Sequence, residues 1–297
     1  MGKALLKSAY EHFTKYQVWL ERQPLSEHSK RAYRSRLNHF LAYIVQSDAG
    51  KDVFKDGSER DYILKDYKRY LKNTHKASPS SVNGALAAAD SFFQFLGLGP
   101  TKVKRESLPA EAPKALSKDE QRRLLHAAAR ARRPKDRAIV TLLFYTGIRI
   151  SECAALDFDD VYAQGRKRRV IVRSGKGDRY REVPLNGDVC EALQVWLQER
   201  AQKFAGRETA EAFFLNQKGG RMTTSALDLI VRKVGHEAGL EISAHILRHT
   251  LVTMLVRKGN DLVLVAEIAG HKKLETTRRY SLPTAADKAL ALEGLIE

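Results

Sequence analysis

The last third of the chain reads His245-Ile246-Leu247-Arg248-His249, then Gly270-His271, and then Tyr280. A phenol has an unperturbed pKa of about 10, so a tyrosine nucleophile needs cationic neighbours and a proton acceptor to react at neutral pH. Arginine and histidine are side-chain types that supply these two properties. Their order ahead of a tyrosine indicates covalent chemistry on a phosphodiester.

The composition indicates a folded protein with a polyanionic partner. At 297 residues the chain exceeds the usual single-domain size, so two domains, each with its own core, are expected. Lys and Arg number 52 against 35 Asp and Glu, giving a formal net charge of +17, while 43% of the residues are hydrophobic. Nucleic acid is the polyanion that this excess favours. A membrane surface is the alternative, but it requires an apolar helical face or a lipid anchor, and neither is visible in the sequence.

The apolar segments and the N-terminus favour a cytoplasmic protein. The longest nearly uninterrupted apolar run, 138–148, is too short to span a bilayer, and the first residues lack the apolar core of a signal peptide. The two cysteines, Cys153 and Cys190, have no CxxC spacing, so neither a zinc site nor a disulfide framework is supported. Both are expected to be buried thiols.

Residues 1–97 are predicted to form a helical bundle. In its second segment, apolar residues recur at helical spacing and polar residues occupy the opposite face. The predicted helices are 3–22, 27–46, 59–74 and 79–96. The stretch from Gly97 to Pro113 is rich in glycine, proline and charge and has no sustained period, which places an interdomain linker at 98–115.

Residues 116–297 are predicted to form a second, mixed domain. Ser117 followed by Glu120 fits a capping box at its first helix. Short β-branched runs at 169–172 and 181–184, separated by Gly175-Lys176-Gly177-Asp178, predict a hairpin. Helices are predicted at 118–131, 135–146, 187–204, 223–238, 244–258, 261–268, 273–281 and 284–295. The fold class is therefore mainly α with a small antiparallel β-sheet.

Two arginines are candidates for binding the oxygens of a phosphodiester. Attack on phosphorus places negative charge on the non-bridging oxygens, and planar guanidinium forks match that geometry better than ammonium groups do. Arg248 is one candidate. Arg149 is the other, because it follows a helix-ending glycine and lies three residues before Glu152, which is spaced to hold it in place.

The remaining candidates handle protons. A leaving 5′ oxygen needs a general acid, and Lys176 at the hairpin tip fits that need. His245 is a candidate to share protons with Tyr280, and His271 to donate to a phosphate oxygen. Asp and Glu do not cluster at metal-ligand spacing beside these residues, so the arginines and histidines are expected to take the role that magnesium has in two-metal nucleases. A metal-independent reaction is expected.

Each of these residues also has a purely structural interpretation. A hairpin lysine such as Lys176 is most often solvent-facing. Tyr280 and His249 fit core positions, and Arg149 fits an ordinary ion pair with Glu152. The ordered set of Arg, Lys, His-x-x-Arg, Gly-His and Tyr favours the catalytic interpretation, because the chances of matching its parts at random must be multiplied.

Four motifs in the chain resemble those of the tyrosine recombinases, also called phage integrases, and most closely the compact Xer-like members. They are Thr146-Gly147-Ile148-Arg149-Ile150-Ser151-Glu152, Gly175-Lys176-Gly177 through Val183-Pro184-Leu185, His245-Ile246-Leu247-Arg248-His249-Thr250, and Gly270-His271 through Tyr280. The resemblance spans 116–282, and residues 8–97 are similar to the family's helical core-binding domain. Two departures are local. Ile268-Ala269 replace the usual two leucines, and Ser281-Leu282 follow the tyrosine where a histidine is usual.

The resemblance implies a catalytic role for each matched residue. Tyr280 would form a 3′-phosphotyrosyl link to DNA and release a 5′ hydroxyl, and Lys176 would protonate that leaving oxygen. Arg149 and Arg248 would clamp the scissile phosphate.

The resemblance also implies how such a protein acts on DNA. His245 would be the acid or base partner of the tyrosine, and His271 would hydrogen-bond the phosphate. The covalent link keeps the free energy of the phosphodiester, so strand exchange would need no ATP or other cofactor. The partner would be double-stranded DNA with paired recombination sites. It would be bound by a tetramer in which a C-terminal tail, 284–297, docks on a neighbouring protomer.

Five further residues are candidates for DNA contacts. Two basic domains joined by a linker suit a clamp around a duplex, with affinity dominated by phosphate contacts. The candidates on the second helix and beside the hairpin are Arg31, Arg34, Asn38, Arg173 and Arg179. A solvated helix face is an equally good interpretation for the first three.

Two other functions fit part of the sequence. A type IB topoisomerase has the same chemistry but relaxes supercoils as a monomer, without pairing two sites. A repressor or accessory factor on the same scaffold would bind DNA without cutting it. The complete set from Arg149 to Tyr280 disfavours the latter, because a binding protein has no need to retain a nucleophile with every partner.

Overall fold

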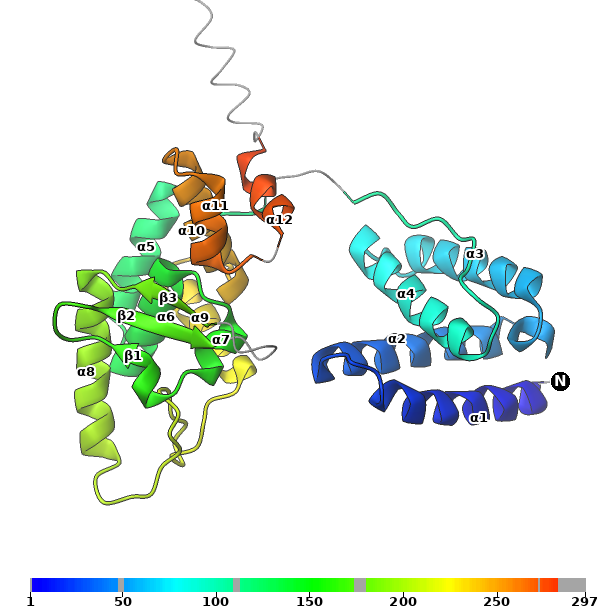
Figure 1. Ribbon diagram of the computed structural model, residues 1–297, viewed down its shortest axis with the longest axis horizontal. Helices are drawn as coiled ribbons and strands as arrows, with labels where there is room; N and C mark the ends of the chain where they lie inside the picture. Colours follow the sequence, from blue (N-terminus) through cyan, green and yellow to red (C-terminus); the bar gives the residue numbers. More distant parts are fainter. Residues whose placement is uncertain (1, 48–50, 109–112, 174–179, 272, 283–297) are drawn as a thin grey trace, which may run out of the picture. The chain divides into compact units, whose positions relative to one another are not determined.

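The computed structural model describes residues 2–47, 51–108, 113–173, 180–271 and 273–282. The chain divides into two compact units between Pro109 and Ala110 (Figure 1), a point that lies within the linker predicted at 98–115. Helices dominate both units, and the strands form one three-stranded antiparallel sheet, which confirms the predicted fold class. None of the helices within these ranges is both long and apolar enough to cross a membrane.

The first unit is a bundle of helices. Its elements are α1 (Gly2–Glu21), α2 (Glu27–Gln46), η1 (Lys51–Phe54), α3 (Gly57–Asn73) and α4 (Pro79–Phe95). Serine side chains cap two of these helices, because Ser26 accepts from the N–H of Ser29 and Ser78 does the same for Ser81. The four predicted helices match α1 to α4 to within two residues at each end.

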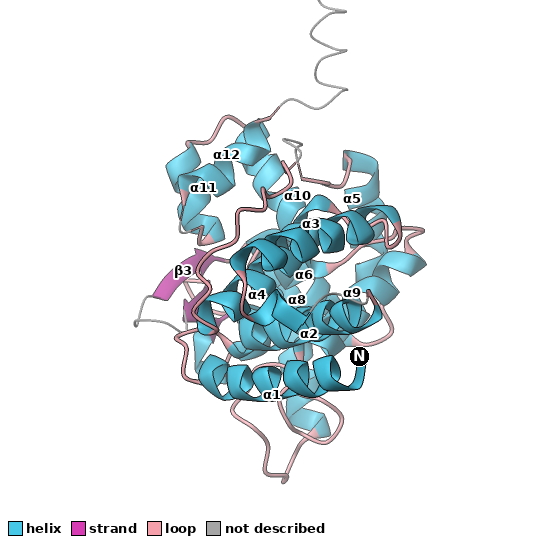
Figure 2. Cartoon of the chain, turned by 90° about the vertical axis from the view of Figure 1, so that its right-hand side faces the viewer, coloured by secondary structure: helices cyan, strands magenta, loops and turns pink. Residues whose placement is uncertain are grey.

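Aromatic side chains fill the centre of this bundle. Tyr16, Phe40, Tyr67, Phe92 and Phe93 are all fully buried. The first two helices lie side by side in both views, and α2 also packs on α3 and α4 (Figure 2). The second segment's predicted apolar face is therefore the face that enters the core.

The first part of the predicted linker is bound to this unit. Arg60 in α3 donates from Nη1 to the carbonyls of Leu98, at 2.5 Å, and Gly99, at 3.1 Å. Lys68 donates to the carbonyl of Lys104 at 2.7 Å and forms an ion pair with Glu106. Residues 98–106 therefore lie against α3 rather than apart from both units.

The second unit surrounds α6 with helices and places the sheet at its side (Figure 1). The helices are α5 (Lys118–Ala129), α6 (Pro134–Thr146), α7 (Ile150–Ala155), α8 (Gly187–Lys203), α9 (Thr224–Glu237), α10 (Ala244–Arg257), α11 (Leu262–Ala269) and α12 (Leu274–Arg278). Short 3-10 helices are η2 (Phe158–Asp160) and η3 (Arg279–Ser281). The capping box predicted at Ser117 and Glu120 is present at the start of α5. The helix predicted at 284–295 lies outside the described residues.

The sheet is a short meander. Its strands are β1 (Val161–Tyr162), β2 (Arg169–Arg173) and β3 (Tyr180–Pro184), in the order β1-β2-β3. Val170 pairs with Val183, and Val172 with Arg181, so the predicted hairpin strands are confirmed. The buried valines face the helices, while β3 packs against α11. The turn that joins β2 to β3 lies outside the described residues.

The core of the second unit forms around the buried helix α6. Trp196 of α8 is buried there and donates its indole N–H to the carbonyl of Phe213 at 3.2 Å. Helix α6 ends at Gly147, whose φ of +59° is left-handed. A Cβ at Gly147 would also lie 2.7 Å from Leu251 of α10, so only glycine permits this close approach. Both cysteines are buried and free, as predicted.

Candidate active site

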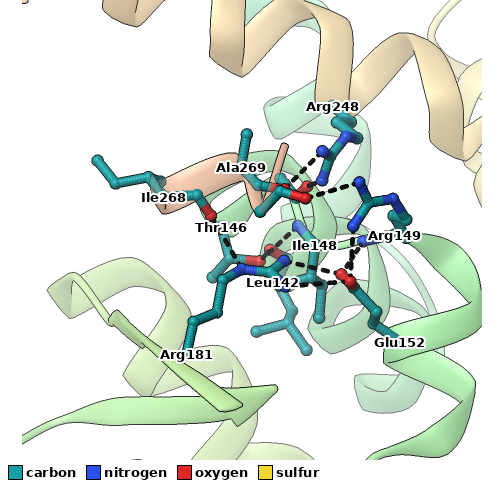
Figure 3. Close-up of polar contacts among 11 residues, drawn as sticks. Leu142, Thr146, Ile148, Arg149, Glu152, Arg181, Arg248, Ile268 and Ala269 are labelled. Atoms are coloured by element: carbon teal, nitrogen blue, oxygen red, sulfur yellow. Dashed lines mark hydrogen bonds and ion pairs between the residues drawn. The ribbon is translucent and has the colours of Figure 1, made fainter. Parts of the chain in front are cut away.

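Three guanidinium groups converge on the end of α11, where they bind three successive main-chain carbonyls (Figure 3). The contacts are Arg181 Nε to Ile268 O at 3.2 Å, Arg248 Nη2 to Ala269 O at 2.5 Å and Arg149 Nη2 to Gly270 O at 2.8 Å. The last carbonyls of a helix lack intrahelical partners and form the negative end of its dipole. These carbonyls therefore attract the guanidinium groups and fix their orientation.

Glu152 fixes the orientation of two of these arginines. It accepts from the main-chain N–H of Arg149 at 2.7 Å and from the Nη1 of that residue at 2.8 Å, as the sequence spacing predicted. Arg181 of β3 donates to both carboxylate oxygens of Glu152, at 3.0 and 2.8 Å. The carboxylate thus joins the sheet to the start of α7, while 42% of the Arg149 side chain remains exposed.

The net pKa of Glu152 is lowered. Burial alone would raise the pKa of this carboxyl group, but hydrogen bonds from Arg181 and from the Arg149 N–H, together with both positive charges, outweigh that effect. A carboxylate whose folded-state pKa is lowered stabilises the fold above its unfolded pKa, which is about 4.5. That contribution is lost as the pH falls through the folded-state value.

Glu152→Gln is therefore expected to lower the free energy of unfolding at neutral pH, and the gap to the wild type should narrow below about pH 4.5. Urea unfolding at a series of pH values measures this gap. The exposed Glu267 supplies the matched control, Glu267→Gln, which should stay within about 0.5 kcal/mol of the wild type at neutral pH. If the difference in unfolding free energy between Glu152→Gln and the wild type stays constant through the acid range, the lowered pKa of Glu152 is contradicted.

Arg248 of α10 is the buried arginine of the site. Only 3% of it is exposed, and its Nη1 donates to the carbonyl of Gly147 at 2.6 Å. Burial, and then the charge of Arg149, lower the pKa of Arg248 to about 10, so the guanidinium stays charged at neutral pH. Its guanidinium group bridges the ends of α6 and α11. Each of these helices ends at a glycine with a left-handed backbone conformation, Gly147 and Gly270.

Tyr280 lies in η3 with its ring inside a small apolar cluster. Only 5% of it is exposed, and its neighbours are Val252, Val265 and Ala269. Its hydroxyl lies 2.5 Å from Nδ1 of His249. Burial raises the pKa of Tyr280, and nearby arginines oppose that shift in part.

Two histidines contact Tyr280, and a third, His245, contacts one of them. His271 stacks on the tyrosine with ring centroids 6.0 Å apart, and its Nδ1 lies 2.8 Å from Oγ1 of Thr277. His245 contacts His249 edge to face, with centroids 4.1 Å apart. The sequence predicted that His245 shares protons with the tyrosine, whereas the structure places His249 on its hydroxyl. Among the described residues, no hydrogen bond joins His245 to Tyr280.

Burial and nearby arginines lower the pKa values of His245 and His271. Burial, followed by the positive charges of Arg248 and Arg149, lowers the pKa of His245 and brings that of His271 to about 4. Within the described ranges, no three His, Cys, Asp or Glu side chains are grouped so as to hold a metal ion.

The candidate DNA contacts on α2 differ in their surroundings. Arg31 and Asn38 are exposed, which fits a DNA-facing helix and a solvated helix face equally well. Arg34 is half-buried and forms an ion pair with Glu21 of α1. A contact from Arg34 to a phosphate would therefore compete with an internal carboxylate.

The candidates near the hairpin are only partly described. Arg173 is 68% exposed and pairs with Asp160 at 2.7 Å. Lys176 and Arg179 lie outside the described residues.

Sequence patterns missed two polar residues of this site. Arg181 has no local signal, because its partner carboxylate is 29 positions away in the chain. His249 has one, since it lies four residues after His245 and so shares its helix face.

Comparison with known proteins matches most of the chain to one family. The model of the Phage integrase family matches residues 114–286, and that of the Phage integrase N-terminal SAM-like domain matches residues 11–97. Tyrosine recombinase XerC of Roseiflexus sp. (strain RS-1) is 32% identical over 263 residues, which cover 84% of this chain and 82% of that protein. Tyrosine recombinase XerA of Thermococcus kodakarensis is 28% identical over 96% of this chain and 98% of its own.

Solved structures agree with this placement. A XerA recombinase crystal structure is 27% identical, covers 97% of this chain and 99% of its own, and superimposes with a TM-score of 0.55. XerH site-specific recombinase bound to difH substrate shares the fold at 23% identity, with a TM-score of 0.69 over 89% of this chain and 78% of its own. Because the first family model alone covers more than half of the sequence, the chain belongs to the phage integrase family of tyrosine recombinases.

Proposed function

We propose that this recombinase cuts and rejoins double-stranded DNA at specific sites by transesterification through Tyr280. The observation that carries the proposal is the meeting of Arg149 and Arg248 at the end of α11, in the same site as His271 and Tyr280. The XerH relative was crystallised with its difH substrate, which supports DNA as the substrate here.

The chemistry divides among the residues as follows. The phenolic oxygen of Tyr280 bonds to phosphorus while the bond from phosphorus to the 5′ oxygen breaks, and Lys176 protonates that leaving oxygen. Arg149 and Arg248 neutralise the charge that builds on the non-bridging oxygens. The product is a 3′-phosphotyrosyl ester, which a 5′ hydroxyl attacks in the reverse reaction.

The remaining parts of the proposal concern protons and energy. His271 donates to a phosphate oxygen, and His245 acts as an acid or base within the site. The phosphotyrosyl ester keeps the free energy of the broken phosphodiester, so rejoining requires no ATP. Guanidinium groups stabilise the transition state in place of metal ions.

DNA binding by this protein rests on its charge. A net charge of +17 favours contacts with phosphates and makes affinity fall steeply with salt. The partner is double-stranded DNA with paired recombination sites. Recombining two duplexes breaks each of their strands, so four tyrosines must act, which a tetramer supplies. We include in the proposal that the C-terminal tail, outside the described residues, joins neighbouring protomers.

Covalent capture tests this proposal. The protein is incubated with duplexes that carry a randomised segment and a nick, so that cleavage releases a short strand and traps the intermediate. A denaturant-stable protein–DNA adduct is expected, and peptide mass spectrometry should locate the 3′ phosphate on Tyr280. The proposal would be refuted if none of the sequences formed an adduct, or if the DNA were attached to a different residue.

The DNA sequence that is enriched among the captured duplexes then distinguishes a recombinase from a topoisomerase of the same chemistry. Two copies of it on one plasmid should yield recombined products, whereas a topoisomerase would relax the plasmid without pairing the copies. Relaxation without any recombinant product would exclude the proposed reaction while leaving the tyrosine chemistry intact.

A further inference from the structure

His249 and Tyr280 form a close polar pair across two elements. His249 lies on α10 and Tyr280 on η3, and the phenolic oxygen is 2.5 Å from Nδ1. The rings are tilted by 47°, with centroids 5.5 Å apart, so the contact is made through the nitrogen and hydroxyl rather than through ring faces. The imidazole therefore lies within proton-transfer distance of the candidate nucleophile.

Burial decides the direction of this hydrogen bond. A buried phenol needs an acceptor for its proton, and Tyr280 is only 5% exposed. Among the described residues, Nδ1 of His249 is the acceptor that the hydroxyl reaches. A neutral imidazole offers one acceptor nitrogen and one N–H, so the phenol donates to Nδ1 and Nε2 carries the hydrogen.

The other two histidines are less well placed to take this proton. His271 lies parallel to the tyrosine, with 18° between the ring planes, and its Nδ1 is engaged with Thr277. His245 contacts the ring of His249 rather than the phenol. The geometry therefore favours His249 as the acceptor of the phenolic proton.

The surroundings of His249 keep it able to accept a proton. Burial, followed by His245, Arg248, Arg279 and His271, lowers the pKa of His249 to about 4, so it is neutral throughout the neutral range. A phosphodiester bound by the arginines places negative charge near His249 and raises the pKa of His249. The base thus becomes stronger when the substrate arrives.

We infer that His249 is the catalytic base that takes the proton of Tyr280. The inference rests on the proposed function and adds one step to it. As the phenolic oxygen bonds to phosphorus, its proton moves to Nδ1 and forms an imidazolium. The bond from phosphorus to the 5′ oxygen breaks, and the general acid assigned to Lys176 protonates that oxygen. In the reverse reaction the imidazolium returns the proton to the departing phenol.

The test replaces His249 with asparagine, whose amide oxygen accepts the phenol's hydrogen bond but takes up no proton. Single-turnover cleavage of the captured site is measured from about pH 6 to about pH 10. At neutral pH, the rate of His249→Asn is expected to fall by roughly 10²–10⁴-fold. The deficit should shrink as the pH rises, by up to about tenfold per unit, because the tyrosinate fraction then rises without a base. A purely structural role would give a deficit that does not depend on pH.

A second substrate separates the base from the acid. A bridging sulfur at the 5′ position leaves as a thiolate and needs no proton, so this substrate bypasses a missing general acid but not a missing base. His249→Asn should therefore stay slow on it. Rescue by the sulfur substrate would overturn the inference and make His249 part of the acid pathway.

The controls separate failure of the proposed function from failure of the role assigned to His249. His126→Asn, at an exposed position on α5, should cleave at the wild-type rate. Band-shift titration and thermal unfolding should show that His249→Asn binds DNA and folds. If the wild type forms no adduct, the proposed function fails. If the wild type cleaves and His249→Asn matches it, only the role of His249 is rejected.

Discussion

Tyr280→Phe is expected to eliminate the covalent protein–DNA adduct while the protein still folds and binds DNA. Phenylalanine keeps the ring within the cluster of Val252, Val265 and Ala269 but has no oxygen to bond to phosphorus. Loss of the hydrogen bond to His249 should cost only about 1 kcal/mol of stability. Denaturing gels report the adduct, and band shifts report binding.

The matched control for this change is Tyr62→Phe. Tyr62 lies on α3 and is 63% exposed, so losing its hydroxyl should leave adduct formation and stability unchanged. An adduct that persists in Tyr280→Phe would show that another residue is the nucleophile.

Arg248→Lys is expected to damage both the chemistry and the folding of the protein. The guanidinium binds the carbonyls of Gly147 and Ala269 while 3% exposed, and an ammonium group cannot reproduce that fork. Loss of a transition-state donor should slow cleavage by roughly 10²–10³-fold. A carbonyl left without its charged donor should lower the free energy of unfolding by about 1.5–3 kcal/mol.

Single-turnover cleavage and urea unfolding measure these two losses separately. The control is Arg122→Lys, because Arg122 is 79% exposed and pairs with the similarly exposed Asp119 on its own helix. That change should stay within about 0.5 kcal/mol of the wild type and leave the cleavage rate as it is. If Arg248→Lys cleaves DNA at the wild-type rate, Arg248 is not needed to bind the scissile phosphate.

The helices were predictable where local signals were strong. Ser26, Ser78 and the Ser117–Glu120 box begin their helices as their residue types favour. Helix α7 was missed because six residues are too few to show a period, and β1 because it has only two. Both are defined by tertiary contacts, which a local pattern does not contain.

The site was predictable to the extent that its partners are near in sequence. Arg149 and Glu152 are three residues apart at the start of the short helix α7, so their pairing followed from spacing. Arg181 reaches the same carboxylate from a strand, and only the packing of β3 on α11 brings it there. The choice between His245 and His249 likewise depends on where η3 lies against α10, which helical periodicity alone does not specify.

The anchoring of three arginines on carbonyls 268–270 bears on how this site tolerates sequence drift. Every residue type carries a main-chain carbonyl, so Ile268 and Ala269 serve as well as the two leucines usual in the family. Gly270 has no such freedom, because its φ is +65° and a Cβ there would lie 2.6 Å from Arg181. The side chains that end α11 can therefore vary to suit their neighbours without moving the three arginines.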